Sequence, residues 1–150
     1  MGKIRLSVSF EYSMGCIFFD PAFNFPNGGE PKPKLLVLLN EPTEEDEPYI
    51  FVWTTSEWPR TIVGCYPELQ CFFIPGAADC FPKDTHICLH DFFGATELDY
   101  NISNYRDRLS EKTLGQLVSC IKIVRDVPVD FLGFILKSWK RHCRGGTSSV

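Results

Sequence analysis

The sequence Lys-Leu-Leu-Val-Leu-Leu-Asn at residues 34–40 is a continuous apolar run of the length of a β-strand. An apolar run without alternation is typical of a strand covered on both faces, so we expect a central, buried strand here. The stretch before it, residues 21–33, is rich in Pro, Asn and Gly and predicts a loop. The acidic stretch after it, between Pro42 and Pro48, predicts an exposed hairpin loop.

Further strands are predicted on both sides of this central one. Residues 4–12 alternate apolar and polar side chains with a period of two, which indicates a half-buried strand. Residues 16–20 and 49–54 are short runs rich in apolar and aromatic side chains, and we expect strands there as well. Two more strands are expected at 70–74 and 85–90.

The pattern changes after Arg108, where helical spacing replaces strand spacing. Ser110 is a good N-cap, and apolar residues recur at helical spacing from Leu114 to Val124. Pro128 ends that unit and starts a second helix. The apolar stripe of this second helix consists of Phe131, Leu132, Ile135, Leu136 and Trp139. About six short strands followed by two helices predict a mainly β fold, a small antiparallel barrel with helices on one side.

Length and composition bound the organisation of the chain. A chain of 150 residues with 44% hydrophobic and 23% charged side chains fits one well-buried core, which excludes a disordered chain and a two-domain enzyme. We expect residues 1–126 to form the β-barrel domain with the first helix. We also expect an added C-terminal helix at residues 127–144 and a disordered tail at residues 145–150.

The net charge of −4 argues at first sight against a nucleic-acid partner. Five acidic residues, however, fall within 41–47, and the rest of the chain carries +1. A negative total therefore leaves room for a basic groove, although it makes a large DNA footprint unexpected. No apolar stretch reaches the roughly 18 residues of a membrane span. The N-terminus lacks the apolar block of a secretory signal, so we expect a cytoplasmic protein that contacts no membrane.

The seven cysteines are scattered and contain no Cys-x-x-Cys pair, so the pattern of a zinc ribbon is absent. We expect them to be small buried hydrophobic residues. A disulfide framework is the alternative, and the missing secretion signal disfavours it.

The segment His86-Ile87-Cys88-Leu89-His90 is the sharpest local pattern. On a strand, His86, Cys88 and His90 share one face. These side chains could bind a metal, or the histidines could act as acid and base in RNA cleavage. The alternative is a strand whose Ile87 and Leu89 face the core while the histidines face solvent or a partner.

Two further patterns suggest a phosphate site. Thr54, Thr55 and Ser56 place three hydroxyls at the end of a strand, where they can bind phosphate oxygens or cap a turn. Lys34, at the start of the most buried strand, could neutralise a phosphate, although exposed lysines are also common at strand edges.

Read in order, these pieces resemble the PemK/MazF family of toxin ribonucleases from toxin–antitoxin systems. The resemblance covers roughly residues 15–124 and depends on the order of the elements more than on identity. The matching pieces are Gly-Cys-Ile-Phe-Phe-Asp at 15–20, Gly-Gly-Glu at 28–30, Lys-Pro-Lys-Leu-Leu-Val-Leu-Leu at 32–39, Phe-Val-Trp-Thr-Thr-Ser at 51–56, Asp-Thr-His-Ile-Cys-Leu at 84–89 and Arg-Asp-Arg-Leu-Ser-Glu-Lys at 106–112.

The resemblance implies an SH3-like barrel that forms a homodimer and binds single-stranded RNA, with an antitoxin protein as a further partner. It implies cleavage without a metal or other cofactor, in which the ribose 2′-hydroxyl attacks the adjacent phosphate. The family's catalytic arginine falls on Lys34, and its catalytic threonine or serine falls on Thr55. The substrate-binding residues expected beside them are Lys32, Thr54, Ser56, His86 and His90.

The chain departs from the family pattern at functional positions. Lys34 lacks the bidentate guanidinium that suits a phosphate. The stretch after the late apolar strand, Asp-Phe-Phe at 91–93, has no basic residue where the family has one. A catalytically inactive SH3-like module that binds a protein through the same groove or the acidic loop is therefore the alternative to an endoribonuclease. A metal-dependent hydrolase built on His86, Cys88 and His90 is a third hypothesis.

Overall fold

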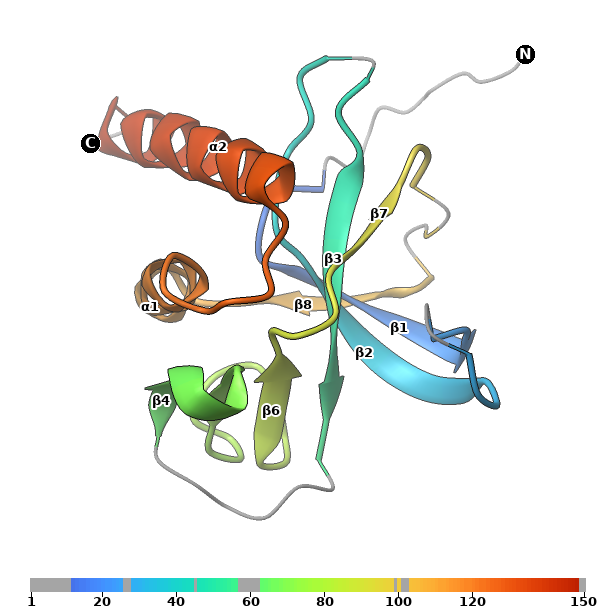
Figure 1. The fold of residues 1–150 in the computed structure, drawn as a ribbon. Coiled ribbons are helices and arrows are strands. Elements are labelled where there is room, and N and C mark those ends of the chain that lie inside the picture. The colour runs from blue at the N-terminus through green and yellow to red at the C-terminus, as the bar shows by residue number, and fades with distance from the viewer. Residues whose placement is uncertain are drawn as a thin grey trace.

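The long strand at residues 49–55 is the centre of the architecture in the computed structural model (Figure 1). The structure describes residues 12–25, 28–44, 46–56, 63–98, 100 and 103–148, without the side chains of 145–148. Eight strands precede two helices, and a short 3₁₀ turn at Pro67–Leu69 lies between the fourth and fifth strands. The strands are β1 (Cys16–Phe23), β2 (Lys32–Leu38), β3 (Tyr49–Thr55), β4 (Gly64–Tyr66), β5 (Cys71–Ile74), β6 (Thr85–Cys88), β7 (Phe93–Ala95) and β8 (Tyr105–Arg108), and the helices are α1 (Glu111–Ile121) and α2 (Val129–Ser148).

All pairings among these strands are antiparallel, in the order β4-β5-β6-β3-β2-β1-β8. One edge of β3 pairs with β2, where Trp53 faces Leu36. The other edge is shared, because the first half of β3 pairs with β7 and the second half with β6. The prediction of a central strand is confirmed, since β2 lies between β1 and β3, but the strand spans Lys32–Leu38 where the prediction gave 34–40. Within the described residues, β4 and β8 end the order without pairing to each other.

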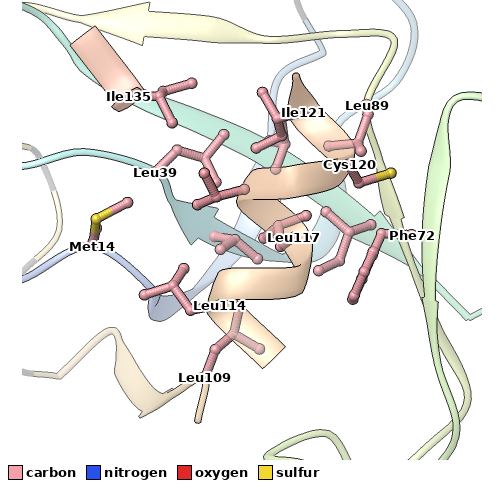
Figure 2. Close-up of a cluster of buried hydrophobic side chains, with 14 of the residues drawn as sticks. Met14, Leu39, Phe72, Leu89, Leu109, Leu114, Leu117, Cys120, Ile121 and Ile135 are labelled. Carbon is pink, nitrogen blue, oxygen red and sulfur yellow. The ribbon is translucent and has the colours of Figure 1, made fainter. Parts of the chain in front are cut away.

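Apolar side chains pack on both faces of the sheet. One cluster lies between the sheet and the two helices, which Figure 1 shows on the same side of β3. There Leu114, Leu117 and Ile121 of α1 are fully buried among residues that include Phe72 of β5 and Leu39, which directly follows β2 (Figure 2). The second cluster, on the opposite face, is built mainly from aromatic rings of β1, β3 and their neighbours. The coarse fold prediction, antiparallel sheet with two C-terminal helices, is therefore confirmed.

The first helix begins where the sequence predicts. The hydroxyl of Ser110 accepts a hydrogen bond from the amide of Thr113 at 3.3 Å, which satisfies one of the free amides at the helix start. The second helix extends through 145–148, where the sequence predicts a disordered tail. Of the two helices in the described chain, neither is apolar over a length that could cross a membrane.

Asp79 ties the loop before β6 to the start of α1. Its carboxylate accepts hydrogen bonds from the hydroxyls of Ser110 at 2.7 Å and Thr113 at 2.6 Å, and from the amides of Ser110 and Cys80. Burial alone would raise the pKa of Asp79, but these donors outweigh it and the pKa is lowered. The folded state therefore stabilises the ionised form of the Asp79 carboxylate.

We expect Asp79→Asn to lower the free energy of unfolding by about 1 kcal/mol at pH 7, because the neutral amide offers one acceptor oxygen where the charged carboxylate offers two. Because the pKa of Asp79 is lowered on folding, its contribution is present above the unfolded pKa of about 4 and is lost as pH falls through the lower folded value. Thermal unfolding followed by circular dichroism from pH 7 to pH 3 should show the two proteins converging. The exposed Asp46→Asn is the control, and a difference that stays constant with pH would contradict this account.

The acidic loop, predicted as an exposed hairpin loop, is bound to the second helix. Glu47, with a fully buried side chain, accepts a hydrogen bond from Asn40 and lies 3.6 Å from Nζ of Lys137. The amide of Glu41 donates to the hydroxyl of Ser138 at 2.9 Å. Two of the five acidic residues therefore hold α2 against the sheet.

The cysteine prediction is wrong for one disulfide pair and for Cys143, which is exposed. Cys65 of β4 and Cys120 of α1 form a disulfide, with Cα atoms 5.4 Å apart. The two residues are 55 positions apart in sequence and meet because α1 packs beside β4, which spacing alone does not reveal. Cys16, Cys71 and Cys88 are buried free thiols, as expected, while Cys80 is half-buried and Cys143 is exposed.

Several predicted boundaries also differ from those in the structure. β1 continues to Phe23 into the predicted loop, and β6 ends at Cys88 instead of residue 90. β5 begins at Cys71, because Gln70 adopts a left-handed conformation with φ of 50°. The three-residue strands β4 and β7 and the polar strand β8 are absent from the prediction. The predicted strand at 4–12 lies almost wholly outside the described residues.

Candidate functional site

A cleft of about 280 Å³ lies where β3 ends beside the start of β2. Four segments that are distant in sequence form it: β1, the start of β2, the end of β3, and the segment that leads into β6. Its half-buried or buried lining residues are Phe19, Lys34, Leu35, Thr54, Thr55, Phe81 and Thr85, and its exposed ones are Pro33, Ser56, Pro82 and Lys83.

Strand register brings Lys34 and Thr55 to the same part of the cleft. The pairing of β2 with β3 ends at Leu36 and Trp53, and beyond it Lys34 and Thr55 both line the cleft. The two residues that the sequence predicts as catalytic are thus neighbours at one end of the cleft.

Two of the threonine hydroxyls in the cleft hold its walls together. Oγ1 of Thr54 donates to the carbonyl oxygen of Leu35 at 2.8 Å, which joins β3 to β2 at the cleft. Oγ1 of Thr85 donates to the carbonyl oxygen of Lys83 at 2.8 Å and fixes the segment leading into β6. The remaining hydroxyls of the lining belong to Thr55, which is buried, and to Ser56, which is exposed.

The charged residues lining the cleft are both lysines. Lys34 and Lys83 line it, and no carboxylate is present among the eleven lining residues. In a chain with a net charge of −4, this local composition favours an anionic ligand. Nζ of Lys34 lies 5.3 Å from the centroid of the Trp53 ring, in the range of a cation–π contact.

The histidines and Cys88 lie outside this cleft lining. His86 is 1% exposed and its ring lies 4.7 Å from that of Phe73, while His90 is exposed and packs edge-on against Trp53 at 5.6 Å. Burial raises the pKa of the Cys88 thiol, and the positive charge of Lys34 only partly opposes that effect. Cys88 is therefore a protonated core thiol and a poor nucleophile. In the described part of the chain, no three His, Cys, Asp or Glu side chains are grouped to hold a metal ion.

Of the seven predicted site residues, the structure brings Lys34, Thr54, Thr55 and Ser56 together. Lys32 is exposed on β2 and does not line the cleft. Sequence reasoning missed Phe19, Phe81 and Lys83, which complete the walls. The Phe-Pro-Lys sequence at 81–83 indicates only a turn, and its place beside β3 depends on the pairing of β6 with β3.

Comparison with known proteins found no relative of this chain. No family model matches the chain, no curated protein matches it, and no solved structure matches it. The chemistry of the cleft is that of its lining: two ammonium groups, hydroxyls at a strand end and apolar walls. Such a lining can hold a phosphate and stabilise negative charge that develops on it.

Proposed function

We propose that this chain is a PemK/MazF-like toxin, an endoribonuclease that cleaves single-stranded RNA without a metal. The observation that carries the proposal is the cleft lined by Lys34, Lys83 and the hydroxyl-bearing end of β3, with no carboxylate among its lining residues. The resemblance assigns catalysis to Lys34 and Thr55, and both residues line this same cleft.

In the proposed reaction, the ribose 2′-oxygen attacks the adjacent phosphorus and the bond from phosphorus to the 5′-oxygen breaks. The 2′-hydroxyl loses its proton, the leaving 5′-oxygen gains one, and the products are a 2′,3′-cyclic phosphate and a 5′-hydroxyl. The ammonium group of Lys34 offsets the charge that develops on the phosphate oxygens. Thr55 and Ser56 supply hydroxyl donors, and Phe19 with Phe81 forms an apolar wall beside them.

The proposal extends to fold, assembly and place of action. It includes an SH3-like barrel, a homodimer with the RNA bound across the dimer groove, an antitoxin partner and action in the cytoplasm, where RNA substrates occur. Disulfides are rare in cytosolic proteins. Reduced Cys65 and Cys120 in cell extracts would therefore support a cytoplasmic location, and the disulfide of the structure in those extracts would contradict it. Light scattering that gives twice the monomer mass tests the assembly.

The test is incubation of the purified chain with single-stranded RNA of mixed sequence in EDTA. We expect fragments that end in a 2′,3′-cyclic phosphate, detected by mass spectrometry. DNA of the same sequence should stay intact because it lacks the attacking hydroxyl. Intact RNA at high protein concentration would contradict the proposal. Recovery of a stoichiometric protein partner in that case would favour the catalytically inactive interaction module.

A further inference from the structure

Arg106 lies next to the cleft although it is outside the lining described above. The pairing of β8 with β1 sets Asp107 opposite Ile17 and Tyr105 opposite Phe18, so Arg106 between them has no opposite residue. This is a β-bulge, a device that redirects a side chain and is over-represented beside active sites. The redirected guanidinium lies with its carbon 5.0 Å from the ring centroid of Phe19, a wall of the cleft.

The guanidinium of Arg106 is held in one orientation by the backbone. Its Nη1 donates to the carbonyl oxygens of Ser103 at 2.9 Å and Tyr105 at 3.2 Å. The Phe19 ring supports the guanidinium on one side. A long side chain that is already ordered loses less conformational entropy when it binds a ligand.

The other edge of this guanidinium is available to a ligand. Within the described residues, Nε and Nη2 of Arg106 make no hydrogen bond and no carboxylate forms an ion pair with the group. The adjacent carboxylate, Asp107, accepts a hydrogen bond from the amide of Arg108 at 2.7 Å. The parallel N–H groups of a guanidinium edge fit two oxygens of one phosphate.

We propose that Arg106 binds a second phosphate of the RNA strand, on the Phe19 side of the cleft, while Lys34 and Lys83 hold the phosphate that reacts. This inference rests on the proposed function and assigns Arg106 to substrate binding, outside the chemical step. Arg106 then supplies the guanidinium that Lys34 lacks, on the other side of the Phe19 ring from the phosphate that reacts. The strand then crosses the cleft from the end of β3 toward β8.

The test measures binding of a fluorescent single-stranded RNA whose riboses are 2′-O-methylated, so that it cannot be cleaved. Anisotropy titrations over a range of salt concentrations give the affinity and its salt slope. Arg106→Ala should weaken binding about three- to tenfold and reduce the slope by about 0.7, the value for one phosphate contact on a single strand. Arg106→Lys should keep most of the slope and lose part of the affinity, because the charge remains and the fork is lost.

Two controls separate the possible outcomes. Arg125→Ala removes the same charge from an exposed position between α1 and α2 and should leave binding unchanged. Circular dichroism of each variant identifies any loss of folding. If Arg106→Ala does not fold, the comparison of Arg106→Lys with the wild type decides whether the guanidinium binds RNA. Wild-type affinity and slope in Arg106→Ala, together with weakened binding in Lys83→Ala, would overturn the role of Arg106 and leave the proposed function standing. No RNA binding by the wild-type protein would overturn both.

Discussion

Lys34→Ala is expected to reduce the rate of RNA cleavage by about 10²- to 10³-fold, the usual effect of removing one group that stabilises transition-state charge. Lys34 lies at the start of β2 and lines the cleft beside Thr55. Its contact with the Trp53 ring keeps the ammonium at this end of the sheet. Alanine removes the charge without changing the strand pairing, so the loss should be in kcat more than in KM.

Three variants make this prediction specific. Lys34→Arg keeps the charge and adds the bidentate fork, so it should retain at least the wild-type rate. Thr55→Val keeps the β-branched shape and removes the hydroxyl donor, and we expect a loss of the same order as for Lys34→Ala. Lys140→Ala, exposed on α2, is the charge control and should cleave at the wild-type rate. Unchanged cleavage in Lys34→Ala would contradict the catalytic role of Lys34, and the activity would then depend on other residues.

The part of the site that is formed by two neighbouring strands, β2 and β3, was the part best predicted from the sequence. The apolar run at 34–40 and the aromatic run at 49–54 each indicate a strand, and the end of one meets the start of the other in an antiparallel pair. Lys34 and the hydroxyls at 54–56 are therefore predictable as neighbours. The helix start at Ser110 is predictable for a similar reason, because a cap acts over three residues.

The remaining parts of the site depend on contacts between distant segments. Lys83 and Phe81 reach the cleft through the pairing of β6 with β3, which no local pattern shows. Arg106 reaches Phe19 through a bulge in a strand whose sequence, Tyr-Arg-Asp-Arg, has no apolar alternation. His86 was expected to bind substrate, yet its side chain is buried beside the Phe73 ring, and Ile87 on the other face of β6 is buried in the cluster beneath the helices. Period-two reasoning assumes that one face is solvated.

The same kind of long-range contact makes the Cys65–Cys120 disulfide important for stability. It joins β4, at the end of the strand order, to the buried side of α1. β4 has three residues, all paired with β5, and the disulfide adds a covalent link from this short strand to α1. A crosslink over 55 residues restricts the unfolded chain strongly, and the loop-entropy relation gives about 4 kcal/mol.

We therefore expect the double variant Cys65→Ser/Cys120→Ser to unfold in urea with a free energy lower by about 4 kcal/mol. The double substitution avoids leaving one reactive thiol. Wild-type protein in excess dithiothreitol should shift to the same midpoint, because reduction removes the same crosslink. Cys143→Ser, at an exposed cysteine of α2 outside the disulfide, should unfold like the oxidised wild type. Identical midpoints for the wild type with and without reductant would contradict a stabilising disulfide.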